Sequence, residues 1–111
     1  MPRIISDKLS GLKSLCRRHK VKYLYVFGSV LTDDFGDDSD IDFLYDLEEE
    51  SISGKEYLRN LDKLISGLLE AFPGRKVDLV HYPSIRNPYL LHSIDTTKTL
   101  LYAQRPEEVS I

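Results

Sequence analysis

The residues best suited to chemistry in this chain are paired aspartates and a Gly-Ser turn. Asp40 and Asp42 alternate at the start of one strand-like segment, and Gly28-Ser29 ends an earlier one. Alternate residues of a strand point to the same face, roughly 6.5–7 Å apart, so the two carboxylates should lie side by side. In a half-apolar setting they repel each other unless a cation lies between them. Such hard oxygen ligands suit Mg²⁺ or Mn²⁺, which also take phosphate oxygens as ligands.

A third carboxylate, Asp78, comes from a later strand-like segment. Its neighbours Val77, Leu79 and Val80 are apolar, so we expect a costly unpaired charge unless Asp78 has a partner. If this strand lies beside the strand of Asp42, Asp78 can join the same metal cluster. It can also accept the proton of an attacking hydroxyl group.

Gly28 and Ser29 stand at a strand end, where their backbone N–H groups and the serine hydroxyl can bind phosphate oxygens. Each of these features also has a plainer interpretation. An Asp-x-Asp pair in an acidic segment can be a solvated strand edge, and a Gly-Ser pair after a strand can be a simple turn. The chemical interpretation therefore depends on the features occurring together.

Charge is distributed unevenly along the 111 residues, although the net charge is only −3. Residues 1–22 hold seven basic and one acidic residue, whereas residues 23–54 hold ten acidic residues and no basic one. An anionic block of this kind repels a phosphate backbone, so we expect no direct binding of duplex nucleic acid. The length of 111 residues predicts a single domain, over residues 1–104, and the 41% apolar fraction is enough for one core. Residues 105–111 are predicted to form a flexible tail.

The sequence also limits the compartment and the kinds of metal site. Its apolar stretches are too short for a membrane span and no secretory signal is visible, so we expect a cytoplasmic protein without membrane contact. A single cysteine, Cys16, excludes an internal disulfide and a multi-cysteine zinc site. His81 and His92 have no third histidine beside them, so this pair does not favour a zinc site.

The hydrophobic pattern predicts the elements that position these residues. Helical spacing predicts helices, with Ser6 and Asn87 as N-caps, over residues 6–19, 55–72 and 88–94. Runs of β-branched and aromatic residues predict strands over residues 21–27, 41–45, 76–80 and 99–103. This order indicates an α/β (α+β) domain in which one small sheet packs against helices. The strand directions stay open, because long helical connections favour parallel pairing and a short link permits antiparallel pairing.

The tyrosines should pack in the core and strands, and three of them could instead stack on a base: Tyr23, Tyr25 and Tyr82.

Taken together, the motifs resemble a known superfamily. Phe27-Gly28-Ser29, a ten-residue spacer, Ser39-Asp40-Ile41-Asp42 and the acid of Val77-Asp78-Leu79-Val80 resemble nucleotidyltransferases of the polymerase β type. More narrowly, residues 1–103 look like the minimal nucleotidyltransferases. The resemblance implies a nucleotidyltransferase fold with a small mixed sheet. It also implies transfer of AMP from ATP to a hydroxyl group, with release of pyrophosphate.

The resemblance assigns roles to the motif residues. Asp40 and Asp42 would bind two Mg²⁺ ions, and Asp78 would share one of them and help to deprotonate the acceptor. The nucleotide-binding residues would be Gly28, Ser29 and Ser39, the first two holding the β- and γ-phosphates. Many relatives carry arginines shortly after the Gly-Ser pair, but Val30 and Thr32 stand here. Neutralisation of the triphosphate would then need other cations, chosen from Lys22, Arg75, Lys76, Arg86 and Lys98.

Minimal relatives of this length commonly pair with a HEPN-domain toxin. The resemblance therefore implies an antitoxin that adenylylates a tyrosine of such a partner. Two alternatives stay open: an antitoxin that neutralises its partner by docking alone, and a subunit of an antibiotic nucleotidyltransferase whose acceptor pocket forms by oligomerisation. A homo-oligomer or a hetero-oligomer is compatible with these alternatives.

Overall fold

The structure, a computed structural model, describes residues 1–109. Its helices are α1 (Arg3–Ser6), α2 (Leu9–Arg18), α3 (Gly54–Ala71) and α4 (Pro88–Thr97). Its strands are β1 (Val21–Phe27), β2 (Ile41–Leu47), β3 (Val77–His81) and β4 (Thr99–Ala103). Short 3₁₀ turns lie between them: η1 (Gly28–Leu31), η2 (Glu49–Ser51), η3 (Tyr82–Ser84) and η4 (Pro106–Glu108).

The four strands form one mixed sheet in the order β3-β2-β1-β4. β1 pairs antiparallel with both β2 and β4, whereas β2 and β3 run parallel. A loop joins β1 directly to β2, while the parallel β2–β3 pair needs the long crossover through α3. Both pairing directions that the sequence left open therefore occur, and the small mixed sheet packed against helices is confirmed.

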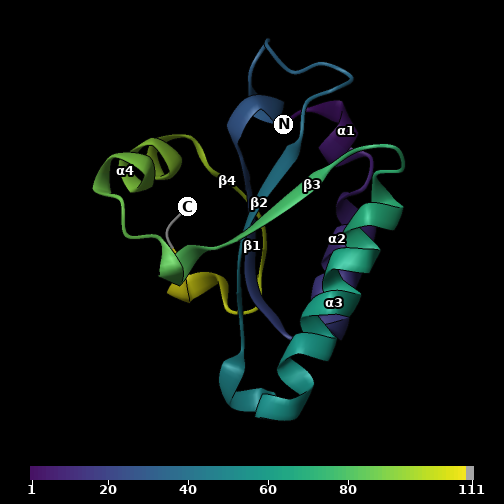
Figure 1. Ribbon diagram of the computed structural model, residues 1–111, viewed down its shortest axis with the longest axis vertical. Helices are drawn as coiled ribbons and strands as arrows, with labels where there is room; N and C mark the ends of the chain where they lie inside the picture. The colour runs from purple at the N-terminus through teal and green to yellow at the C-terminus, as the bar shows by residue number, and fades with distance from the viewer. Residues whose placement is uncertain (110–111) are drawn as a thin grey trace.

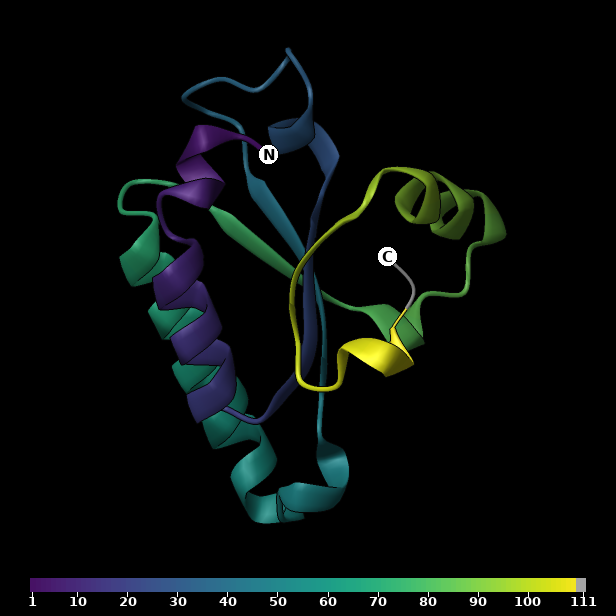
Figure 2. The ribbon, with the colours of Figure 1, turned by 180° about the vertical axis from the view of Figure 1, so that it is seen from behind.

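Helices cover the two faces of the sheet unequally. Helices α2 and α3 lie side by side on one face, and α4 lies on the opposite side (Figures 1 and 2). The larger core fills the space under α2 and α3, with Leu12, Phe43 and Leu68 almost fully buried there. A smaller core of Tyr25, Leu44 and Ile94 lies on the α4 side. Burial of each such large apolar side chain contributes about 1.5–3 kcal/mol, so most of the stability comes from the α2–α3 side.

The two long helices approach each other closely at Gly67. A Cβ atom at this position would overlap Cδ1 of Leu15 on α2, so a larger residue would require the Leu15 side chain to move. Cys16 is fully buried beside this contact on α2. Burial raises the pKa of its thiol to about 12, so the thiol stays protonated and acts as a small apolar side chain.

The structure corrects one predicted helix and extends others. The helix predicted to begin at residue 6 begins at Leu9, because a turn at Asp7 and Lys8 separates it from the short α1, and Ser6 ends α1 instead of capping α2. This bend allows Ile5 and Leu12 both to be buried in the same core. The cap at Asn87 is confirmed, since its side chain accepts hydrogen bonds from the N–H groups of the next helical turn, and α4 continues three residues beyond the predicted end at residue 94.

Strand β2 runs two residues past its predicted end at residue 45. Within the tail predicted over residues 105–111, a 3₁₀ turn spans Pro106–Glu108, and residues 110–111 lie outside the described residues. Across residues 1–109, no helix combines the length and the apolar character that a membrane span needs.

Candidate functional site

The sheet register brings the predicted site residues to one end of three neighbouring strands. Phe27, the last residue of β1, lies opposite Asp42 in the antiparallel β1–β2 pair. Asp42 in turn lies opposite Asp78 in the parallel β2–β3 pair. The expectation that the strand of Asp78 adjoins the strand of Asp42 is therefore confirmed. Gly28 and Ser29 begin the 3₁₀ turn that follows Phe27 at the same end.

Position 28 requires glycine because of its backbone conformation and because of its contact with a neighbouring side chain. Its φ of +83° lies in the left-handed region, which side-chain-bearing residues rarely adopt. A Cβ atom at Gly28 would also overlap Oδ2 of Asp42. The two halves of the motif are thus in direct contact, because the missing side chain makes room for the Asp42 carboxylate. This contact explains why glycine, and not merely a turn residue, stands at position 28.

The three aspartates differ in burial. Ile41 and Phe43 point into the core with no exposed surface, which leaves the half-buried Asp42 on the opposite face of β2. Asp40 is exposed and lies just before the strand begins. Asp78 is exposed as well, which corrects the expectation of a buried unpaired charge in an apolar strand. The reason is topological: β3 is an edge strand, so Asp78 can be hydrated without a partner.

The electrostatics of Asp42 indicate how the group would behave toward a cation. Burial raises the pKa of the Asp42 carboxyl, and the carboxylates of Asp78 and Asp40 raise it further. Each of these effects disfavours the charged form, and a divalent cation at the same place would reverse the two charge repulsions. An all-oxygen group of this kind fits Mg²⁺ or Mn²⁺. The residues present are therefore suited to the ions that the resemblance implies.

Arg75 holds the acidic loop between β1 and β2, although the sequence analysis named it as a cation for the triphosphate. Arg75 donates hydrogen bonds to the carbonyl oxygens of Gly36, at 2.9 Å, and Ser39, at 3.3 Å. Its guanidinium also lies 4.4 Å from the ring centroid of Phe35. The Ser39 hydroxyl accepts a hydrogen bond from the Gly36 N–H at 3.0 Å. Arg75 and Ser39 thus shape the loop that leads into Asp40, and no sequence motif marked this role.

The other candidate cations lie in different surroundings. Lys22 is at the end of β1 far from Gly28. Lys98 packs over the ring of Tyr82, with Nζ 5.9 Å from the centroid, and pairs with Asp95 at 3.2 Å. Arg86 donates to carbonyl groups of its own turn. The exposed Lys76 directly precedes β3, and its carbonyl accepts the Ile41 N–H at 3.0 Å, so Lys76 lies at the same end of the sheet as the aspartates.

The tyrosines pack against one another beneath α4. The rings of Tyr23, Tyr25 and Tyr82 meet edge to face, with centroids 5.5–6.3 Å apart. Tyr25 is only 2% exposed, so its ring has no free face for a base. The prediction that these tyrosines serve packing first is confirmed for Tyr25.

Comparisons with known proteins agree with this arrangement. The family described as "Polymerase beta, Nucleotidyltransferase" matches residues 11–107. A chain of Methanocaldococcus jannaschii named "Putative protein adenylyltransferase" is 35% identical over 96 residues, which cover 78% of this chain and 91% of the relative. Another chain of the same name and organism is 38% identical over 95 residues, with the same coverage of both chains.

Solved structures share the fold. One described as "Structure of putative minimal nucleotidyltransferase" has a TM-score of 0.68 and 27% identity, and the match covers 89% of this chain and 95% of that chain. Another, described as "Crystal structure of the toxin-antitoxin with AMP-PNP", has a TM-score of 0.58 and 23% identity, and the match covers 89% of this chain and 76% of that chain. At that lower identity the second likeness concerns the fold alone.

Proposed function

The chain belongs to the polymerase beta nucleotidyltransferase family and is a nucleotidyltransferase, and on that premise we propose that it transfers AMP from ATP to a tyrosine hydroxyl of a HEPN-domain partner protein. In this role the chain is the antitoxin of a toxin–antitoxin pair. The observation that carries the proposal is the convergence of Gly28, Asp42 and Asp78 at one end of three neighbouring strands.

The residues of this end divide the work between metal and nucleotide. Asp40, Asp42 and Asp78 would hold two Mg²⁺ ions, and Mn²⁺ could replace them. When bound, such ions neutralise charge on the attacking and leaving oxygens of an in-line displacement. The N–H groups of Gly28 and Ser29 at the start of η1 would bind oxygens of the β- and γ-phosphates. Ser39 completes the nucleotide-binding set from the adjoining loop.

Asp78 is the proposed proton acceptor. In the reaction, the tyrosine oxygen forms a bond to the α-phosphorus while the bond from that phosphorus to the bridging oxygen breaks and pyrophosphate leaves. The hydroxyl proton passes to the Asp78 carboxylate. Because Asp78 is exposed on an edge strand, a hydroxyl carried by another protein can reach it. A deeply enclosed aspartate would serve a small acceptor better.

The proposal of a protein acceptor draws support from two further points. Asp40 and Asp78 are both exposed, so this end of the sheet is open to a large partner. The relatives from Methanocaldococcus jannaschii carry the name "Putative protein adenylyltransferase", and one chain of the same fold was solved in a toxin–antitoxin assembly with AMP-PNP.

The test is transfer of labelled AMP. The purified chain is incubated with Mg²⁺, labelled ATP and a candidate HEPN-domain partner protein, and the partner is examined by intact mass. We expect a gain of the mass of AMP on a partner tyrosine, and no gain with Asp42→Asn. Tight association without any change of mass would reject transfer and support neutralisation by docking alone.

A further inference from the structure

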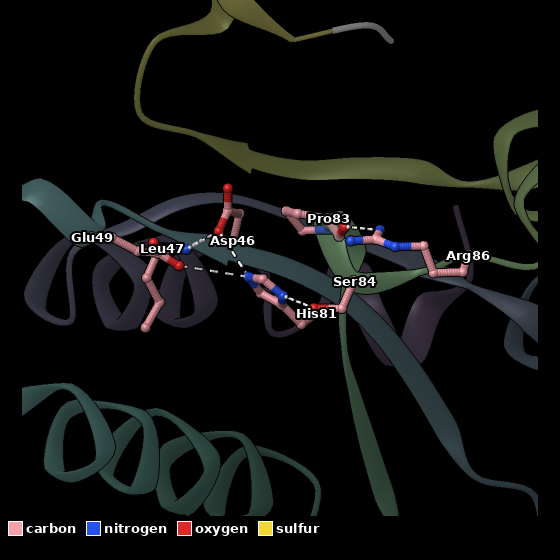
Figure 3. Close-up of polar contacts among 7 residues, drawn as sticks. All are labelled: Asp46, Leu47, Glu49, His81, Pro83, Ser84 and Arg86. Atoms are coloured by element: carbon pink, nitrogen blue, oxygen red, sulfur yellow. Dashed lines mark hydrogen bonds and ion pairs between the residues drawn. The ribbon is translucent and has the colours of Figure 1, made fainter.

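A second group of potential ligands lies at the other end of β2. Asp46 comes from β2, Glu49 from η2 and His81 from the last position of β3. One ligand atom of each lies within 4.8 Å of the other two, and no other trio of His, Cys, Asp or Glu among residues 1–109 meets this limit. Figure 3 shows the His81 imidazole with the Asp46 and Glu49 carboxylates on one side and Ser84 on the other.

The imidazole of His81 is oriented by contacts on its other side. Its Nδ1 lies 2.5 Å from the Ser84 hydroxyl oxygen, and its ring packs against Tyr45 with centroids 5.3 Å apart. These contacts leave Nε2 facing the two carboxylates. Histidines that bind metals commonly have the second ring nitrogen held by a hydrogen bond in this way. The orientation is thus the one that a ligand histidine needs.

The distances also match a small coordination sphere. Nε2 of His81 lies 3.2 Å from Oδ1 of Asp46 and 3.9 Å from Oε1 of Glu49. Ligand atoms bound at about 2.1 Å in a tetrahedral arrangement are about 3.4 Å apart. The observed separations lie on both sides of that value. Small side-chain rotations would therefore complete three sides of a tetrahedral site and leave the fourth side open to water.

The surroundings favour a cation. The group borders an open cavity of about 330 Å³, which is also lined by Glu48, Glu50, Lys22 and Arg105. The Arg105 guanidinium lies 3.8 Å from the carboxylates of both Glu48 and Glu108, so these two residues compensate its charge. Asp46 is only 15% exposed on its side chain, and a partly buried carboxylate is less screened by water.

We propose that Asp46, Glu49 and His81 form a binding site for a divalent transition-metal ion, of which Zn²⁺ is the representative. One imidazole nitrogen with two carboxylate oxygens suits Zn²⁺ and its neighbours in the first row, whereas Mg²⁺ prefers oxygen ligands alone. This site differs in chemistry from the aspartates at the other end of β2. A bound ion would link the end of β3 to the end of β2 and to η2, which directly follows β2 and lies about 30 residues before β3.

The test is Zn²⁺ binding to the full chain without nucleotide. Excess Mg²⁺ occupies all-oxygen sites, and a chromophoric chelator competes for Zn²⁺. We expect one Zn²⁺ per chain and a higher thermal midpoint when Zn²⁺ is bound. His81→Gln and Glu49→Gln should each weaken the affinity by about tenfold or more. His92→Ala, which removes an exposed histidine from α4, should leave the affinity unchanged.

Two variants are used because one of them, His81→Gln, could fail to fold. Glu49 is 61% exposed on its side chain, so Glu49→Gln should keep the wild-type circular dichroism spectrum even if His81→Gln does not. Absence of stoichiometric Zn²⁺ binding by the wild type would overturn the proposal and leave a simple histidine–carboxylate pair. Unchanged affinity in Glu49→Gln and His81→Gln would overturn it as well, because the ion would then be bound elsewhere.

Discussion

The two ends of β2 present carboxylates on the same face of one strand, yet their surroundings differ. Asp42, Leu44 and Asp46 alternate along the strand, so the two acids are separated by four residues, about 13 Å. At one end Asp42 faces Asp78 and the missing side chain of Gly28. At the other end Asp46 faces an imidazole. β2 fixes the positions of the two acids, and the residues contributed by the neighbouring segments determine the charge and the ligands around each acid.

The difference is one of charge compensation. Burial raises the pKa of the Asp42 carboxyl, and its like-charged neighbours Asp78 and Asp40 raise it further. Asp46 has the His81 ring nitrogen within 3.2 Å. In the proposed function, cations and phosphates from solution would compensate the charge of the first group. The second already has a nitrogen donor and suits a resident ion. The predictions below change residues at the Asp42 end, and the first three each compare the change with a matched variant elsewhere in the chain.

The largest expected effect separates the two ends by chemistry. Asp78→Asn should slow AMP transfer by roughly 10²-fold or more, the scale of a lost general base, while ATP affinity changes only modestly. The exposed position of Asp78 means that the amide should not disturb folding. Glu49→Gln, at the opposite end of the sheet, should transfer at nearly the wild-type rate. Single-turnover transfer to the partner measures both, and a near-wild-type rate for Asp78→Asn would remove it from the site.

The next effect concerns the backbone at the Asp42 end. Gly28→Ala should lower the free energy of unfolding by about 2 kcal/mol, because the left-handed conformation alone costs roughly 1–2 kcal/mol with a Cβ atom and overlap with Asp42 adds to it. Gly36→Ala is the matched control, since a Cβ atom there meets nothing within 4 Å. Urea unfolding compares the two. Equal losses in both variants would show that the Gly28–Asp42 contact has no special role.

A smaller effect is expected for nucleotide binding. Asp40→Asn should weaken binding of Mg·ATP by about tenfold, or about 1.4 kcal/mol, because one of the carboxylates proposed to bind the metal is lost. Asp38→Asn removes the same charge from an exposed position of the neighbouring loop and should have little effect. Isothermal titration calorimetry measures both affinities. If the two variants lose the same amount, the effect of Asp40 is one of overall charge and not of coordination.

The smallest effect tests the cost of the Asp42 charge, which arises from burial and from the carboxylates of Asp78 and Asp40. With divalent ions removed by a chelator, Asp42→Asn should stabilise the fold at neutral pH by less than about 1 kcal/mol, because solvent screens a half-buried group. A raised folded-state pKa means that the penalty grows as pH rises from the unfolded value, about 3.9, through the folded one. The advantage of Asp42→Asn should therefore vanish toward pH 4. Thermal midpoints across pH 4–7 would contradict this account if the gap stayed constant.

Local pattern predicted most of the elements and the motif, but not the environment of each residue. The strands around Tyr25 and Phe43 and the cap at Asn87 follow from side-chain chemistry that acts over a few residues. The burial of Asp78 was predicted wrongly from its apolar neighbours. Exposure depends on whether a strand is central or at an edge, which is a property of the sheet order and not of the segment.

Contacts distant in the sequence escaped prediction for the same reason. Arg75 binds the loop at Gly36, 39 residues earlier, and no local signal connects them. His81 meets Asp46, 35 residues away, only because β2 and β3 pair in parallel. From sequence alone His81 was compared with His92 as a second histidine, whereas its neighbours are carboxylates. Both contacts depend on the register of the strands, and that register is set by the packing of the whole sheet.

The edge position of β3 has a further consequence for the behaviour of the protein in concentrated solution. An edge strand leaves one row of backbone N–H and C=O groups free to pair with a strand of another molecule, and charged side chains oppose that pairing. Among residues 77–81, Asp78 is the only acidic residue, and it is exposed. The carboxylate proposed to take the proton therefore also protects the edge against self-association. Without this charge, Val77, Leu79 and Val80 would lie on an edge that has no acidic side chain. The protein should then self-associate more readily in concentrated solution.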